Sequence, residues 1–140
     1  MLKGISPKIS PSLLNILARM GHGDEIVLGD ANFPGEKYNT RVCRADGVGI
    51  PELLDGVLAL FPLDRYSQWQ IGLMQTVDDD PRPPVWETYA DVIARHEGSY
   101  ETRYFERYEF YEQTRGAFAV VITGETALYG NIILKKGVIC

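Results

Sequence analysis

The chain has 140 residues, of which 45% are hydrophobic and 24% charged, and its net charge is −5. This length and this balance predict one soluble domain, residues 1–140, that buries its own core. Binding to nucleic acid or to an anionic membrane needs clustered Lys and Arg, so the acidic composition argues against both partners and favours a small neutral ligand.

The sequence contains no apolar run near the roughly 20 residues that span a bilayer, and its first residues lack the apolar core of a signal peptide. We therefore expect a cytoplasmic protein. Its two cysteines, Cys43 and Cys140, form no spacing motif. We predict reduced thiols rather than a disulfide or a metal site.

The first predicted elements are a helix and a strand. Ser10 is typical of an N-cap and Pro11 of a first helical position, and apolar residues then recur at helical spacing until Gly21. The apolar run "EIVLGDA", residues 25–31, predicts a strand buried on both faces. The turn residues of "NFPG" end that strand, so a parallel or mixed sheet is implied.

The middle of the chain repeats this order. Residues 50–62, "IPELLDGVLALFP", have the apolar spacing of a helix with proline near both ends. Alternating apolar residues predict a strand within 69–77, and "DDDPRPP", residues 78–84, predicts a loop. Apolar spacing predicts a third helix over 85–96.

The last third of the chain is rich in strands. Residues 99–107 are predicted to be extended or irregular, and residues 108–116 a short helix. The segments 117–125 and 131–139 are strongly β-prone. Alternation of strands with helices predicts a three-layer α/β domain, although the strand order cannot be inferred from the sequence.

His22 is the strongest catalytic candidate. Gly21 and Gly23 flank it, and an imidazole with an ordinary pKa of about 6.5 can give and accept a proton near neutrality. The alternative is structural: Gly21 would end the first helix, and His22 would interact with the last carbonyls of that helix.

Asp30 and Arg107 are candidate ligand-binding residues. Asp30 follows the first predicted strand, at the end of an α/β strand where ligands usually bind, although Asp is also common in turns. The planar guanidinium of Arg107 can bracket sugar or carboxylate oxygens. Alternatively, Arg107 forms an ion pair with Glu106 or Glu109.

Further polar candidates precede the last strand. Tyr129 offers a hydroxyl and Asn131 an amide, and Gly130 between them allows close approach of the backbone. The acidic run 78–80 would suit a divalent metal, but no other ligand group is near it in the sequence, so we interpret it as a solvated loop. His96, near a predicted helix end, is explained by the helix dipole.

Four segments together resemble a known family. They are "ISPKISPSLLNILARMGHGDEIVLGDANFP", "RADG", "FYEQTRGAFAVVITGE" and "YGNIILKKGV". Their order resembles the RbsD/FucU family, in particular its L-fucose mutarotase branch, over nearly the full chain. The resemblance implies a three-layer α/β/α domain with a mixed, largely parallel sheet. It also implies an isomerase that interconverts the α and β anomers of a free monosaccharide with no cofactor and no metal.

The resemblance also implies roles for particular residues. Its proton-transferring histidine corresponds to His22, and its substrate-binding positions correspond to Asp30, Arg107, Tyr129, Gly130 and Asn131. The motifs "YGN" and "RADG" favour L-fucose as the sugar. The resemblance further implies a ring-shaped homo-oligomer, often a decamer, with sites at subunit contacts.

The spacing of two candidates bears on this assembly. If residues 22–30 are extended at about 3.3 Å per residue, His22 and Asp30 lie up to roughly 26 Å apart, which is too far to flank one monosaccharide. Either the chain bends sharply at Gly23 or Gly29, or His22 of one subunit meets Asp30 of another. We favour the second arrangement.

Two other classes of protein remain as alternatives. A non-catalytic sugar-binding protein, linked to uptake or regulation, would use the same hydroxyl-binding residues but would need no titrating group. A hydrolase or aldolase is less favoured, because the sequence shows no nucleophile elbow, no second catalytic carboxylate and no cluster of metal ligands.

Overall fold

The fold is built on one six-stranded sheet, which we describe from a computed structural model that covers residues 1–140. The strands lie in the order β2-β5-β1-β6-β3-β4. Their bounds are β1 (Glu25–Gly29), β2 (Val42–Ala45), β3 (Ile71–Met74), β4 (Thr102–Phe105), β5 (Ala119–Thr123) and β6 (Ile132–Lys135). The helices are α1 (Pro11–Arg19), α2 (Gly35–Tyr38), α3 (Ile50–Leu58), α4 (Pro84–Ala94) and α5 (Arg107–Gly116).

The sheet is mixed and largely parallel. Strands β1 and β2 pair with β5 in parallel, and β3 pairs with β4 in parallel. Only β6 is reversed, because it runs antiparallel to both β1 and β3. The carboxyl ends of five strands and the start of β6 therefore share one edge of the sheet, which we call the carboxyl edge. The opposite edge is the amino edge.

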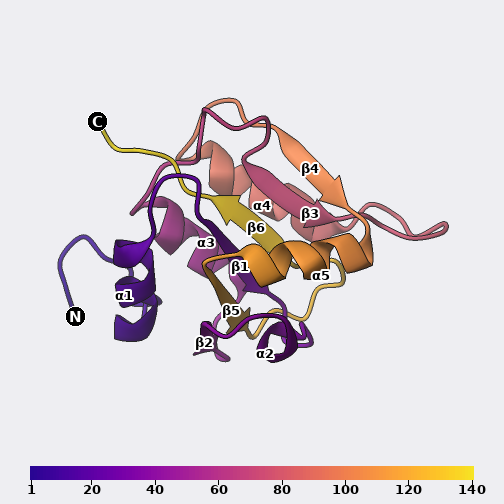
Figure 1. The fold of residues 1–140 in the computed structure, drawn as a ribbon, viewed down its shortest axis with the longest axis horizontal. Coiled ribbons are helices and arrows are strands. Elements are labelled where there is room, and N and C mark those ends of the chain that lie inside the picture. The colour runs from indigo at the N-terminus through magenta and orange to yellow at the C-terminus, as the bar shows by residue number, and fades with distance from the viewer.

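Helices cover both faces of the sheet. Side chains from α1, α3 and α4 pack in one core with Ile26 and Leu28 of β1, whereas Phe110 of α5 packs in a second core with Val27. Successive strand residues point to opposite faces, so β1 contributes to both cores. Figure 1 shows α2 and α5 in front of the sheet, with α3 and α4 behind it. This arrangement confirms the predicted three-layer α/β/α fold.

Several predicted elements are present. The Ser10 hydroxyl accepts a hydrogen bond from the Leu13 N–H at 3.1 Å, and Pro11 begins α1, as predicted. The helices α3 and α4 fall within or close to the predicted segments, as do β1, β3, β5 and β6. None of the five helices has the length and apolar character required to cross a bilayer.

The structure differs from the sequence predictions in two segments and makes a third prediction more specific. The segment "NFPG" was predicted as a turn, but it leads into the four-residue helix α2. Gly35, at the start of this helix, packs closely against β5, because a Cβ at this position would lie 2.6 Å from Ile122 Cδ1. Strand β2 was not predicted, because its short, half-exposed segment is extended through pairing with β5. Residues 102–105 lie in the segment predicted to be extended or irregular, and pairing with β3 makes them a strand.

Candidate functional site

A hollow of about 320 Å³ opens at the carboxyl edge of the sheet, where β1, β3 and β4 end and β6 begins. Open α/β sheets usually bind ligands at this edge, and the volume is near the lower end of the roughly 300–1,000 Å³ of small-molecule sites. We call it the Asp30 hollow. Its polar lining is Asp30, Asn32, Asp80, Arg107, Tyr111, Tyr129 and Asn131.

Asp30 and Asn131 are joined at the floor of the hollow. The Asp30 backbone N–H donates to the side-chain Oδ1 of Asn131 at 2.7 Å, and the Asp30 carboxylate accepts from the Asn32 N–H at 2.9 Å. Asp30 therefore serves both as a turn residue and as part of the lining. The NH₂ group of Asn131 makes no hydrogen bond within the chain and is available to a ligand.

The surroundings of Asp30 favour the protonated form of its carboxyl, compared with a carboxyl that is exposed to water. Burial raises the pKa of Asp30, and the nearby Glu125 carboxylate raises it further. Backbone N–H groups of Asn32 and Phe33 oppose this by stabilising the charge. The group can therefore exchange a proton with a bound hydroxyl or accept a hydrogen bond from one.

Arg107 reaches the hollow from the first position of α5, directly after β4. Its Nε donates to the Tyr111 hydroxyl at 3.1 Å, and its guanidinium lies 5.4 Å from the ring centroid of Tyr108. The Glu106 carboxylate instead caps α5 by accepting from the Tyr108 and Glu109 N–H groups. Arg107 makes no ion pair with Glu106 or Glu109, so its terminal nitrogens remain free for a ligand.

Tyr129 and Gly130 form the turn that enters β6. Tyr129 has a φ of 57°, and its carbonyl accepts a hydrogen bond from the Trp86 indole N–H at 3.0 Å. The Gly130 carbonyl accepts from the Tyr89 hydroxyl at 2.8 Å, and a Cβ on Gly130 would lie 2.9 Å from the Ala127 carbonyl oxygen. Gly130 thus allows the tight turn and lies behind the lining rather than in it.

His22 lies at the opposite edge of the sheet. It precedes β1, its Nε2 lies 2.9 Å from the buried Asp64 carboxylate, and its ring makes an edge contact with Tyr66. The five residues of β1 alone separate it from Asp30 by roughly 17 Å at about 3.3 Å per residue. A sharp bend that would bring His22 to Asp30 within one chain is therefore absent.

The structure also does not show the alternative role of His22, an interaction with the last carbonyls of the first helix. The Met20 N–H, not His22, bonds to the carbonyls of Ile16 and Leu17 at the end of α1. The Gly21 N–H donates to the Asp24 carboxylate at 2.7 Å. The imidazole is 44% exposed and bound to Asp64, so it does not cap α1.

Sequence reasoning missed Asp80 as a lining residue. We interpreted residues 78–80 as a solvated loop, yet Asp80 lines the Asp30 hollow and accepts a hydrogen bond from the Tyr129 hydroxyl. Its position after β3 was the available signal, since carboxyl ends of parallel strands meet at one edge. No group of three or more His, Cys, Asp or Glu side chains gathers in a way that would hold a metal ion.

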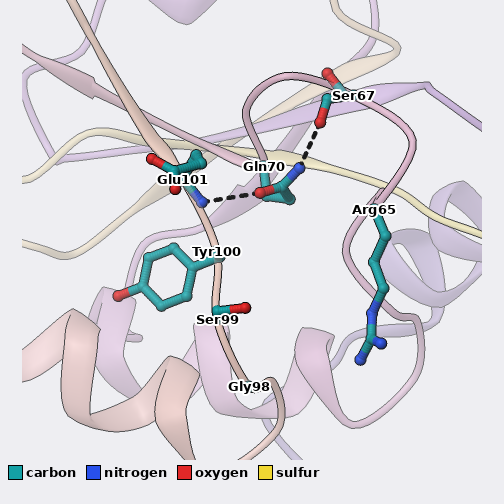
Figure 2. A pocket seen from close by; sticks show the side chains of 7 residues that line it. All are labelled: Arg65, Ser67, Gln70, Gly98, Ser99, Tyr100 and Glu101. Carbon is teal, nitrogen blue, oxygen red and sulfur yellow. Dashed lines mark hydrogen bonds between the residues drawn. The ribbon is translucent and has the colours of Figure 1, made fainter.

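A larger hollow of about 490 Å³ lies at the amino edge, next to the starts of β3 and β4. Figure 2 shows that the Gln70 side chain there bridges the Ser67 carbonyl and the Glu101 N–H. Gln70 also donates to the Asp64 carbonyl at 2.8 Å. Its amide thus joins two loops. The Asp30 hollow lies at the carboxyl edge, where open α/β sheets usually bind ligands, and it brings together four of the residues singled out from the sequence, so it is the better candidate site.

Fold and hollow together define a class: a three-layer α/β protein with a polar, ligand-sized hollow at the carboxyl edge of a largely parallel sheet. The sequence model of the RbsD / FucU transport protein family matches residues 3–139. The chain belongs to this family.

Individual relatives are similar over nearly their whole length. An L-fucose mutarotase from Actinobacillus pleuropneumoniae is 51% identical, with 99% of this chain and 97% of the relative covered. A human fucose mutarotase is 50% identical over 99% and 94% of the two chains. The crystal structure of a fucose mutarotase from Streptococcus pneumoniae, solved in complex with L-fucose, superposes with a TM-score of 0.96 at 50% identity and covers 99% and 100% of the chains.

Proposed function

We propose that this protein is an isomerase that interconverts the α and β anomers of a free monosaccharide, L-fucose. The observation that carries the proposal is the Asp30 hollow, where a carboxyl, a guanidinium, a phenol and an amide converge in a chain about 50% identical to fucose mutarotases. Such neutral and charged hydrogen-bonding groups suit the several hydroxyls of a sugar.

The reaction transfers only protons, and it breaks and re-forms one bond of the sugar ring. A base takes the proton of the anomeric hydroxyl while an acid protonates the ring oxygen, and the bond between the anomeric carbon and the ring oxygen breaks. The carbonyl so formed rotates, and the ring hydroxyl then attacks its other face. General acid–base catalysis by one positioned side chain contributes typically 10²–10⁴-fold, which matters for a reaction that also proceeds in water.

We assign the proton transfers to His22. Its Nε2 faces the Asp64 carboxylate, which favours the tautomer that carries hydrogen on Nε2 and leaves Nδ1 as the basic nitrogen. Asp30 and Asn131 would hold sugar hydroxyls, and Arg107 would donate to them. Tyr129, with Gly130 shaping its turn, would contact a further hydroxyl.

The proposed catalytic site lies between two subunits of a ring-type homo-oligomer such as a decamer. Within one chain His22 and the hollow occupy opposite edges of the sheet, so His22 of one subunit would complete the hollow of another. Large apolar side chains are exposed at both places: Tyr66, 82% exposed, beside His22, and Leu128, 80% exposed, on the rim of the hollow. Single exposed apolar side chains are common on protein surfaces, so the proposal rests on the separation of His22 from the hollow.

We propose the cytoplasm as the place of action. Cys43 and Cys140 are both free thiols, and free thiols are usual in a reducing compartment.

A free reducing sugar, rather than a polymer or a membrane lipid, is the substrate class that a small hollow of this kind accommodates.

Saturation-transfer NMR tests the function directly. Transfer between the two anomeric proton signals should increase when the protein is added to L-fucose, and less so with D-ribose or D-galactose. His22→Ala should lower the enzyme-dependent exchange by about 10²–10⁴-fold, since it removes the proposed acid–base group. The control is His96→Ala, which removes the other histidine. His96 is not part of the lining of the hollow, and its Nε2 lies 2.7 Å from Asp55 Oδ1. Undiminished exchange in His22→Ala would exclude His22 as the acid–base.

One observation favours a non-catalytic sugar-binding protein as the second candidate. A single chain presents a hollow with hydroxyl-binding groups but no imidazole in its lining. Such a protein would bind L-fucose while exchange stayed at the rate of the buffer alone. The same NMR experiment, with binding measured in parallel by calorimetry, separates the two functions.

A further inference from the structure

The loop between β3 and α4 reaches the Asp30 hollow through one side chain. Residues 75–83 form a long excursion beyond the end of β3 (Figure 1) and carry the acidic run 78–80. Of these three carboxylates only Asp80 lines the hollow. Asp79, next to it, makes no hydrogen bond or ion pair and is exposed.

The Tyr129 hydroxyl is held by this loop. The phenol oxygen accepts a hydrogen bond from the Val77 N–H at 3.2 Å, and the phenol O–H donates to the Asp80 carboxylate. The backbone of Tyr129 is fixed as well, because its carbonyl accepts from Trp86. Its φ of 57° is uncommon for a residue with a side chain and persists only where surrounding contacts determine it. Tyr129 is therefore held at both its backbone and its hydroxyl.

These bonds limit what Tyr129 can offer a ligand. A phenol has one O–H donor and two lone pairs. The donor is directed to Asp80 and one lone pair to Val77, so the group that remains for a ligand is one acceptor lone pair. The Asp80 carboxylate also raises the pKa of Tyr129, because it accepts a hydrogen bond from the phenol.

We propose that Asp80 is a positioning residue that acts through Tyr129: it directs the phenolic hydrogen away from the hollow, so that the phenol oxygen recognises a hydroxyl that donates. The inference rests on the proposed function, since it assigns a specificity role within the same hollow. A sugar whose hydroxyl at this place is replaced by hydrogen or by a methoxy group lacks the donor and binds more weakly.

The competing interpretation is that Asp80 only holds its loop. Asp80→Ala and Asp79→Ala distinguish the two, because both remove one carboxylate from the same loop but only the first removes the acceptor of the Tyr129 hydroxyl. An alanine at position 80 has no acceptor, so the phenol hydrogen is free to rotate into the hollow. Comparison with Tyr129→Phe, alone and combined with each loop variant, measures whether Asp80 acts through Tyr129.

The readouts are calorimetric affinity for L-fucose, KM and kcat of anomer exchange, and the thermal midpoint. We expect Asp80→Ala to weaken binding and raise KM by up to about tenfold, the loss expected for one hydrogen bond between a ligand hydroxyl and the phenol, with a smaller change in kcat. Asp79→Ala should stay within about twofold of wild type. In the Tyr129→Phe background, Asp80→Ala should have no further effect on affinity.

Contrary outcomes separate this inference from the proposed function. If Asp80→Ala changes affinity no more than Asp79→Ala does, or weakens binding equally in the Tyr129→Phe background, the positioning role is wrong while the mutarotase proposal stands. A wild-type protein that binds L-fucose without accelerating exchange overturns the catalytic function but leaves the affinity test of Asp80 decisive. Absence of both binding and exchange in the wild type overturns both proposals.

Discussion

Asp30 shows how one side chain serves structure and site together. Its carboxylate closes a turn through the Asn32 N–H and its backbone N–H anchors Asn131, yet it also lines the hollow. Burial raises its pKa, so the folded protein binds the Asp30 proton more tightly than the unfolded chain does. The site thus includes a carboxyl whose charge costs stability.

The pH dependence of stability follows from this shift. Stability from the protonated carboxyl is fully present below the unfolded-state pKa of about 3.9 and is lost as pH rises through the higher folded-state pKa. The variant Asp30→Asn stays neutral at every pH and keeps an acceptor for the Asn32 N–H. We therefore expect its free energy of unfolding, relative to that of the wild type, to rise with pH through this window and to be constant above it.

Urea unfolding of both proteins from about pH 3 to about pH 8, at one protein concentration, measures this difference. A difference between the two free energies that does not vary with pH would contradict the raised pKa. Titration of the Asp30 carboxyl carbon by NMR in the native protein supplies a second, independent measurement.

Helix α1 is the element whose sequence and structure agree most closely. Ser10, Pro11 and the apolar stripe predict its start and its buried face, and the structure contains the Ser10 cap and the buried residues Leu13, Ile16 and Leu17. This agreement has a physical cause: a cap and a 3.6-residue period are local features that neighbouring residues in the chain specify.

The cap of α1 gives a prediction of stability. Ser10→Ala should lower the free energy of unfolding by about 1 kcal/mol, because it leaves the Leu13 N–H without its acceptor. Ser10→Asp keeps an N-cap oxygen and should stay close to wild type. The measurement is urea unfolding followed by circular dichroism. Equal losses in the alanine and aspartate variants would show that the hydroxyl makes no specific contribution.

Strand β2 and helix α2 mark the limit of such local reasoning. The segment Val42–Ala45 has one buried, one exposed and two half-buried residues, and its extended form depends on four residue pairs with β5. Helix α2 has four residues and packs against α5 and β5, which follow it by many residues in the sequence. Neither element has a pattern long enough to be recognised without those neighbours.

For the whole molecule, the reversed strand β6 decides where the candidate residues meet. Because β6 runs antiparallel between β1 and β3, the turn at Tyr129–Asn131 lies at the same edge as Asp30, Asp80 and Arg107. The same topology puts His22 at the other edge. A catalytic site that uses all of these residues therefore requires two chains.

Mixing two variants tests this requirement. His22→Ala and Asp30→Ala should each be inactive alone, but subunits mixed equally after dissociation should regain about a quarter of the wild-type exchange. This fraction follows because a contact needs one intact residue from each side in a head-to-tail ring. Mixing without dissociation is the control. Hybrid assemblies detected by native mass spectrometry without regained exchange would argue against shared sites.

Composition, helical period and strand patterning were enough to predict the layered α/β class, the capped first helix and most strands, since these depend on residues close in the chain. The sequence also supplied the candidates His22, Asp30, Arg107, Tyr129, Gly130 and Asn131. Folding in three dimensions established the strand order, the reversal of β6, the grouping of four candidates in one hollow and the partnership of Asp80 with Tyr129. Those features arise from pairing between strands far apart in sequence, which linear spacing does not encode.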